Sequence, residues 1–368
     1  MDIQTANILK RVSESYNLPG TLIKFTHFIN GHINDTYRVT FAIDKSTYDE
    51  YIFQKINDYV FKEPLKVMHN IKEITLHLQS KKTNIDCDVI TFFDNKVGKN
   101  YTLYEGSYWR ICRFVNNSVS FETAEDSKVL HSAGYAFGRF QYMLSDFQMD
   151  RLFDTIPDFH NTKKRLKDLF DMVALDPFGR VKEVEADIRF FEKHRSVASR
   201  LVDMLENGEL PLRVTHNDTK YNNILMDIHT CEPLCVIDLD TVMPGLTMYD
   251  FGDAIRFAAN TAVEDETDLS MVGLNMENYE EFTKGFICAS KDFLTKNELD
   301  NMALGAITIT IELASRFLAD HLNGDKYFRI HRENHNLDRA RCQIKLAEDM
   351  LAKYDEMRSI VQKHQFSF

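Results

Sequence analysis

The spacing of hydrophobic positions changes once along this chain, near residue 116. Before that point, apolar and polar residues alternate in short runs bounded by turn residues, which is typical of β-strands. After it, apolar residues recur every three or four positions over long stretches, which is typical of amphipathic helices. The pattern therefore predicts an α+β protein in two parts, an antiparallel β-rich part over residues 1–115 and a mostly helical part over residues 116–368.

The β-rich part is predicted to contain a short helix, three strands, a longer helix and two or three further strands. Short turns separate the first three strands, so these are expected to form an antiparallel meander. The predicted helices cover residues 5–16 and 65–79, and the predicted strands cover 22–29, 36–43, 50–56, 88–93, 101–104 and 107–115. This is the order of elements in the N-terminal lobe of a protein kinase. In such a lobe the segment Arg113–Asn116 would form the hinge beneath the adenine of a nucleotide, and Arg113 and Val115 would contact the nucleotide.

The helical part is interrupted once, by a polar stretch between residues 212 and 240. Its predicted helices cover residues 124–145, 161–173, 183–206, 277–290, 296–321 and 336–361. Gly134 and Gly138 lie within the first of these helices and would allow another helix to approach closely. We therefore predict a two-lobed, protein-kinase-like fold, with a nucleotide-binding lobe before residue 116 and a helical lobe after it.

Composition and charge exclude several classes of function. Lys and Arg number 44 against 56 Asp and Glu, which gives a net charge of −12, and such an acidic protein has no general attraction for nucleic acid or anionic membranes. The six cysteines lack the paired spacing of a zinc site, so reduced thiols in a cytoplasmic protein are expected. We find no signal peptide, no apolar run of membrane-spanning length and no coiled coil, and expect a monomer.

The polar stretch carries acid and amide side chains at a recognisable spacing. His216 and Asp218 follow an apolar run, Asn223 comes five residues after Asp218, and Asp238 comes fifteen residues after Asn223. This is the spacing of a kinase-type catalytic loop followed by a metal-binding aspartate. Capping of turns explains any one of these polar residues, but it does not explain all of them at this spacing.

Phosphoryl transfer requires few groups, and the polar stretch supplies them. Asp218 would accept the proton of the attacking hydroxyl, while His216 would support the loop by hydrogen bonding. Asn223 and Asp238 would provide oxygen ligands to Mg²⁺, which bridges the phosphates of ATP. Lys220 would either stabilise the transferred phosphoryl group or lie on the surface.

The roles of three further residues and of one turn are open from the pattern alone. Lys55 would either contact nucleotide phosphates or face solvent on its strand, and Glu73 would be its ion-pair partner or an exposed helix carboxylate. Asp240 would be a second metal ligand or a support for the loop. The turn at residues 30–35, which includes Asn34, would either cover the phosphates or be an ordinary hairpin connection.

The run from His216 to Asp227 resembles the aminoglycoside phosphotransferase and choline kinase superfamily. The run from Ile237 to Arg256 is more specific, and together with residues 30–37 and 312–328 it resembles the N-acetylhexosamine 1-kinases, a group of anomeric sugar kinases. This resemblance implies transfer from ATP, with Mg²⁺, to the C1 hydroxyl of N-acetylglucosamine or N-acetylgalactosamine, with Asp218 as the base. It also implies that Arg316, Tyr327 and His32 face the sugar, or in the case of His32 the phosphates.

Two alternatives stay open. The acceptor would be choline, ethanolamine, homoserine or an aminoglycoside if the acidic run Glu264–Asp268 supplied carboxylates for a cationic substrate, although such a run is usually a solvated loop. A silent nucleotide-binding scaffold is the third hypothesis, and the filled His, Asp, Asn and Asp positions argue against it. Asp250 and Asp253 are expected to support the catalytic loop near a helix that starts at Ala254.

Overall fold

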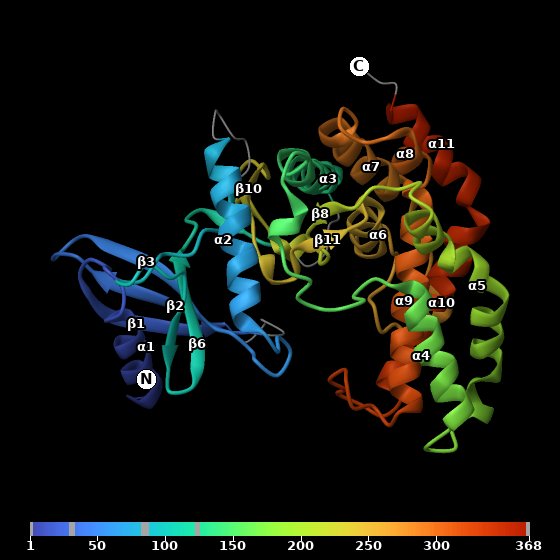
Figure 1. Ribbon diagram of the computed structural model, residues 1–368, viewed down its shortest axis with the longest axis horizontal. Coiled ribbons are helices and arrows are strands. Elements are labelled where there is room, and N and C mark those ends of the chain that lie inside the picture. The colour runs from blue at the N-terminus through green and yellow to red at the C-terminus, as the bar shows by residue number, and fades with distance from the viewer. Residues whose placement is uncertain (1–2, 29–33, 82–87, 122–125, 366–368) are drawn as a thin grey trace.

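A five-stranded antiparallel sheet forms the core of the N-terminal lobe (Figure 1). Its strand order is β1-β2-β3-β6-β5. The computed structural model describes residues 3–28, 34–81, 88–121 and 126–365. The first three strands form the predicted meander, because short turns connect them. The strands are β1 (Thr21–Phe28), β2 (Asp35–Ala42), β3 (Tyr48–Lys55), β5 (Thr102–Tyr104) and β6 (Ser107–Arg113).

The two faces of this sheet pack against different partners. Helix α1 (Ile3–Ser13) covers one face, where Leu9 and Val12 join Phe53 and Trp109 in a small core. The opposite face packs with helix α2 (Pro64–Ser80) and joins the large core of the helical lobe. Because successive side chains of a strand point to opposite faces, the register of each strand decides which residues can reach the site between the lobes.

A second sheet belongs to the helical lobe and has the strand order β4-β10-β9-β7. The sequence predicts residues 88–93 as a strand of the N-terminal lobe, and this prediction holds only at the end of the segment, where Phe92 forms a bridge to Cys112 of β6. Only Asp88–Val89 form a strand, β4, which pairs in parallel with β10 (Pro233–Val236). Residues 114–117 link β6 to β7 (Ser118–Val119), which pairs with β9 (Ile224–Asp227), and a third sheet pairs β8 (Arg213–Thr215) with β11 (Met243–Gly245).

The helical lobe follows the predicted pattern with three changes. The helix predicted at 296–321 is interrupted at Asn301, and the helix predicted at 336–361 is interrupted at Lys353. The helix expected near Ala254 already begins at Thr247. The helices are α3 (Ser127–Met143), α4 (Thr162–Leu175), α5 (Glu185–Glu206), α6 (Thr247–Ala258), α7 (Met276–Ser290), α8 (Lys296–Asp300), α9 (Met302–Leu322), α10 (His335–Ala352) and α11 (Tyr354–Gln365), with 3₁₀ turns at Met149–Arg151, Val181–Val184, Tyr221–Asn223, Leu239–Thr241 and Leu269–Met271.

Glycines allow the central helices of this lobe to touch. A Cβ atom added to Gly134 of α3 would collide with the carbonyl oxygen of Phe282, and one added to Gly138 would collide with that of Phe286, both on α7. The predicted close contact of these glycines with a neighbouring helix is therefore confirmed. Gly252 of α6 and Gly305 of α9 make a similar approach, which holds α6 against the core helix.

Helix α9 is the core helix of the lobe, and it corrects one expectation. The sequence predicts no apolar run of membrane-spanning length, yet α9, at 21 residues, has the length and composition to cross a membrane. Inside the fold, 83% of its most apolar window is buried. The apolar character of α9 is explained by its packing against α4, α6 and α10 (Figure 1).

Candidate active site

Asp218 lies in the loop between β8 and the 3₁₀ turn Tyr221–Asn223. Asn223 Nδ2 donates to Asp218 Oδ2 at 3.0 Å and to the Asp218 carbonyl oxygen at 2.7 Å, and Lys220 Nζ lies 3.2 Å from Asp218 Oδ1. Desolvation acts to raise the pKa of Asp218, but the charge of Lys220 and these hydrogen bonds outweigh it and lower that pKa. Asp218 is therefore a carboxylate at neutral pH, able to accept a proton.

His216 connects the catalytic loop to the segment that carries Asp238. Its Nε2 donates to the carbonyl oxygen of Ile237 at 2.9 Å, and its Nδ1 accepts from the backbone N–H of Asp218 at 3.3 Å. The ring is fully buried. Both ring nitrogens are engaged within the protein, so His216 supports the loop by hydrogen bonding, as the sequence predicts.

Two aspartates of α6 hold the backbone of the catalytic loop. Asp250 accepts from the N–H groups of His216 at 2.8 Å and Asn217 at 2.7 Å, and Gln141 Nε2 donates to it at 2.6 Å. Asp253 Oδ2 accepts from the N–H of Thr219 at 3.1 Å. Their predicted supporting role is confirmed, although both lie within a helix that begins earlier than expected.

Asp238 has an unusual backbone and a carboxylate in an acidic environment. Its φ of 57° lies in the left-handed region, which is costly for a residue other than glycine. Desolvation and the nearby charges of Asp240 and Asp218 raise the pKa of Asp238 to about 7. In the described part of the chain, no hydrogen bond reaches this carboxylate. A divalent cation would neutralise the surplus negative charge, so the residues present fit the predicted metal.

The protein ligands available for such a cation are few. Within the described residues, no group of three or more His, Cys, Asp or Glu side chains is arranged to hold a metal. Asn223 directs its Nδ2 to Asp218, which leaves its amide oxygen, together with Asp238, for coordination. Mg²⁺ often uses one or two protein ligands and completes its shell with substrate phosphates and water.

Asp240 is a support for the loop, which resolves the alternative left open by the sequence. Arg110 of β6 forms a buried ion pair with it, donating from Nη2 to Oδ2 at 3.0 Å and from Nη1 to Oδ1. Asn34 Nδ2 donates to Asp240 Oδ2 at 2.7 Å, while Asn34 Oδ1 accepts from the N–H of Asn57 at 3.0 Å. Asn34 is predicted to bind nucleotide, but its amide is engaged with the protein. His32, from the same turn, lies outside the described residues.

The register of β3 favours the alternative in which Lys55 does not contact nucleotide phosphates. Lys55 pairs with Trp109 across β3 and β6, and directly opposed residues share a face of the sheet. Trp109 belongs to the small core beneath α1, so Lys55 lies on the face away from the catalytic loop. The predicted partner, Glu73, forms its ion pair with Arg151 instead. The sequence signal for this placement is the two-residue spacing between Lys55 and the apolar Phe53, because residues i and i+2 of a strand share a face.

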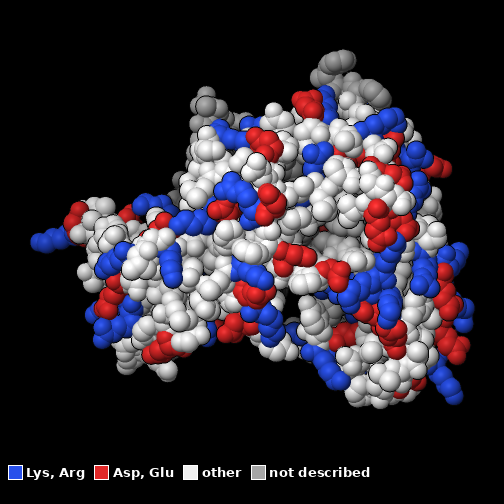
Figure 2. All heavy atoms as spheres, viewed as in Figure 1, with Lys and Arg blue, Asp and Glu red and all other residues white. Residues whose placement is uncertain are grey.

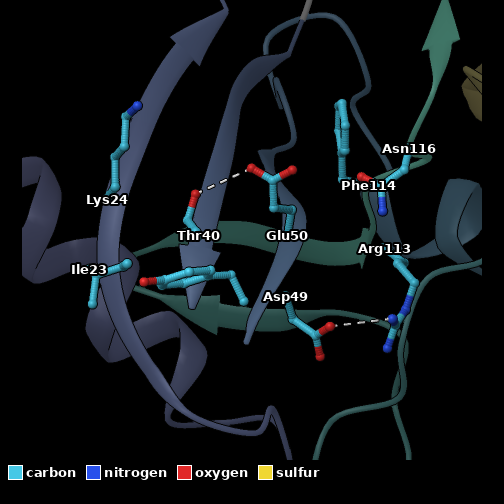
Figure 3. Close-up of a pocket in the computed structure, with 9 residues that line it drawn as sticks. Ile23, Lys24, Thr40, Asp49, Glu50, Arg113, Phe114 and Asn116 are labelled. Carbon is cyan, nitrogen blue, oxygen red and sulfur yellow. Dashed lines mark hydrogen bonds and ion pairs between the residues drawn. The ribbon is translucent and has the colours of Figure 1, made fainter. Parts of the chain in front are cut away.

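A pocket of about 590 Å³ lies beside the predicted hinge (Figure 3). Arg113 is on its rim, with its side chain 65% exposed and 3.6 Å from Asp49. Val115 lies between two lining residues, and its carbonyl oxygen accepts from Ser118 Oγ at 2.6 Å. The pocket is lined by Ile23, Lys24, Thr40, Tyr48, Asp49, Glu50, Arg113, Phe114 and Asn116.

Arg316 and Tyr327, both predicted to face a sugar, lie together at the end of α9. The Arg316 guanidinium carbon is 6.0 Å from the Tyr327 ring centre and 5.5 Å from the ring centres of Phe159 and Phe328. Desolvation lowers the pKa of Arg316, while the charge of Glu312, four residues before it on α9, acts to raise that pKa. Among the described residues Arg316 forms no salt bridge.

Two residues with central contacts in this site are not found by the sequence reasoning. Arg110 sits in a strand between Trp109 and Ile111, and only its parity shows that it points opposite to them. Arg256 of α6 forms a buried pair with Asp253 at 3.0 Å and with Glu264 at 2.6 Å. Asp253 lies three residues before Arg256 on α6, which is a local helical spacing, whereas the fold brings Glu264 to Arg256 and Asp240 to Arg110.

The arrangement agrees with comparisons to known proteins. The model of the phosphotransferase enzyme family (APH) matches residues 24–281. An aminoglycoside phosphotransferase from Alicyclobacillus acidocaldarius superposes with a TM-score of 0.61 at 14% identity, covering 96% of each chain. A choline kinase from Cryptosporidium parvum gives 0.60 at 13%, covering 99% of this chain and 100% of the other. An amicoumacin kinase in complex with AMP-PNP and Ca²⁺ gives 0.58 at 13%, covering 94% and 93%.

These structures share the α+β, kinase-like fold, with an antiparallel N-terminal lobe and a helical C-terminal lobe. The family match spans the nucleotide lobe, the catalytic loop and α6, which together contain Asp218, Asn223 and Asp238. The chain belongs to the phosphotransferase enzyme family.

Proposed function

We propose that this protein is a kinase that transfers the γ-phosphoryl group of ATP, with Mg²⁺, to the C1 hydroxyl of N-acetylglucosamine or N-acetylgalactosamine. The observation that carries the proposal is the Asp218 carboxylate, held between Lys220 Nζ at 3.2 Å and Asn223 Nδ2 at 3.0 Å. Transfer is direct and in line, without a covalent intermediate.

Each residue of the catalytic loop has a separate task in this mechanism. Asp218 aligns the acceptor hydroxyl and takes its proton as the oxygen attacks. Lys220 stabilises negative charge on the phosphoryl group in the transition state. Asn223 and Asp238 would hold Mg²⁺, which neutralises phosphate charge when bound. The pocket beside Phe114 and Asn116 receives the adenine.

The acceptor side of the site favours a neutral sugar over a cationic substrate. Three carboxylates of the acidic run, which would attract a cation, make contacts within the protein. Glu264 pairs with Arg256 at 2.6 Å, and Asp265 accepts from His335 Nε2 at 2.9 Å. Asp268 accepts from the N–H of Ser270 at the start of a 3₁₀ turn. Arg316 forms no salt bridge with any described residue; its positive charge repels an ammonium group, and its guanidinium can donate hydrogen bonds to sugar oxygens.

A screen of acceptors tests this function. ATP consumption is measured with N-acetylglucosamine, N-acetylgalactosamine, choline, ethanolamine, homoserine and kanamycin, and the products are identified by phosphorus NMR. The expected result is a sugar 1-phosphate, formed only when Mg²⁺ is present. Faster phosphorylation of choline or homoserine would assign the second candidate, a kinase for amine-bearing alcohols. Absence of consumption with every acceptor, despite ATP binding, would favour a nucleotide-binding scaffold.

Arg316→Met should separate binding of the acceptor from binding of ATP. Methionine keeps an unbranched apolar chain among Phe159, Tyr327 and Phe328 but removes the guanidinium donors. We expect the KM for the acceptor to rise about 10- to 100-fold, on the scale of a lost charged hydrogen bond in a site. The KM for ATP should change less than twofold. Equal increases in both constants would contradict a role for Arg316 at the acceptor.

A further inference from the structure

A ring of five polar side chains joins the two lobes next to Asp238. Asn34 Nδ2 and Arg110 Nη2 both donate to Asp240 Oδ2, at 2.7 and 3.0 Å. Arg110 Nε donates to Gln54 Oε1 at 3.0 Å, and Gln54 Nε2 donates to Thr36 Oγ1 at 3.2 Å. The Thr36 hydroxyl donates to the carbonyl oxygen of Asn34 at 3.4 Å, which closes the ring. We call these residues the interlobe ring.

Four members of the interlobe ring come from the N-terminal lobe, and only Asp240 comes from the helical lobe. Asn34 lies directly before β2, while Thr36, Gln54 and Arg110 lie on β2, β3 and β6. The ring therefore spans the three neighbouring strands β2, β3 and β6 and ends on the segment that carries the metal ligand. Its geometry fixes the position of that segment relative to the nucleotide-binding sheet.

The ion pair within the ring, between Arg110 and Asp240, is almost completely buried. Arg110 is 1% exposed and Asp240 is 2% exposed. The desolvation cost of such a pair largely cancels its attraction, so burial of the pair adds little to stability. A bidentate arginine–carboxylate pair does, however, fix both distance and orientation. Positioning is therefore the better explanation for a buried pair that crosses between lobes.

Asp238 is held from both sides by these contacts. On one side, Ile237 donates its N–H to the carbonyl oxygen of Asn223 at 2.9 Å and accepts from His216 Nε2 at 2.9 Å. On the other side, Asp240 is fixed by the interlobe ring. Asp238 itself has a φ of 57°, a conformation that persists only where the surroundings over-determine it.

We propose that Arg110 is a positioning residue for the divalent-cation site, acting through Asp240 to hold the Asp238 carboxylate in its coordinating direction. This inference rests on the proposed ATP- and Mg²⁺-dependent function. Arg110 contributes no ligand atom of its own, because its guanidinium is engaged by Asp240 and Gln54. Loss of a residue that orients a metal ligand in this way typically lowers metal affinity about 10- to 100-fold.

Calorimetric binding of ATP, with Mg²⁺ and separately with EDTA, tests the proposal without any acceptor. In Arg110→Met the Mg²⁺ concentration for half-maximal binding should rise about 10- to 100-fold, the range for lost support of a metal ligand. Affinity for metal-free ATP should change less than twofold. Arg110→Lys should fall between the two proteins, since lysine restores the charge but not the bidentate geometry.

Arg213→Met is the matched control. Arg213 also makes a bidentate pair with a buried carboxylate, donating to Glu298 at 2.9 Å from both Nε and Nη2. This pair joins β8 to α8 within the helical lobe and does not cross between the lobes. Arg213→Met should lower thermal stability without changing the Mg²⁺ dependence of ATP binding. If Arg110→Met does not fold, Asn34→Ala removes the second donor to Asp240 and should raise the half-saturating Mg²⁺ concentration about threefold.

The outcomes separate this inference from the proposed function. If the unmodified protein does not bind ATP with Mg²⁺, the proposed function fails. If it binds but the Arg110 and Asn34 variants keep its Mg²⁺ dependence, the positioning role is wrong. A matching loss of affinity for metal-free ATP would also overturn it, because Arg110 would then act on the nucleotide itself or on the fold.

Discussion

Asp218→Asn is expected to lower kcat by about 10²- to 10⁴-fold, the usual contribution of a positioned general base. The substitution keeps the shape of the side chain and removes its negative charge. The amide cannot take the proton of the acceptor hydroxyl, and it loses its charge interaction with Lys220, which lies 3.2 Å away. Steady-state rates with the best acceptor measure the effect, and calorimetry should show ATP affinity within twofold of the unmodified protein.

Asp227→Asn provides a matched control for this prediction. Asp227 lies at the end of β9, a few residues from the catalytic loop, and its carboxylate caps a turn by accepting from the N–H groups of His229 and Thr230, both at 2.9 Å. It should keep near-normal turnover. If Asp218→Asn kept near-normal turnover as well, proton acceptance by Asp218 would not be part of the mechanism.

The secondary structure and the catalytic loop were predictable because their signals are local. Alternating apolar residues in short runs specify the meander, and a three- to four-residue period specifies helices such as α2. The loop from His216 to Asn223 is contiguous, so its chemistry can be recognised from spacing alone. Asp250, which supports this loop, is also near in the sequence, 34 residues after His216.

The contacts between lobes were not predictable in the same way. The partners Arg110 and Asp240 are 130 residues apart, and no spacing rule connects them. The parity of β3 does contain the information that Lys55 shares a face with Phe53, but the kinase analogy favoured a lysine at that position. The short strand β4 shows the same limit, because its partner, β10, lies in the other lobe.

Asp238→Asn is expected to reduce kcat/KM by at least about 10³-fold in the presence of Mg²⁺. It removes the only carboxylate among the proposed metal ligands and leaves two amide oxygens, which bind this hard cation weakly. The loss exceeds that expected for a residue that only orients a ligand, such as Arg110. Activity across a Mg²⁺ titration measures the effect, and full recovery at high Mg²⁺ would contradict a coordinating role for Asp238.

Asp238→Asn should also stabilise the metal-free protein at high pH, because it removes a buried negative charge. Desolvation and the charges of Asp240 and Asp218 raise the pKa of Asp238 from 3.8 to about 7 in the folded state. As pH rises between these values, the unfolded chain releases a proton that the folded protein retains, so the free energy of unfolding falls. Above about pH 7 the full cost of this buried negative charge is present, and asparagine removes it.

Thermal melts of both proteins at pH 5.5 and pH 8, without metal or nucleotide, should therefore show a gain in Tm for Asp238→Asn that is larger at pH 8. Mg²⁺ with ATP should then stabilise the unmodified protein at pH 8, because binding neutralises the charge at Asp238, and should stabilise the variant much less. A variant that is destabilised equally at both pH values would show that Asp238 serves the fold. Loss of activity together with a gain in Tm would show instead that the Asp238 carboxylate destabilises the metal-free fold and is required for metal binding.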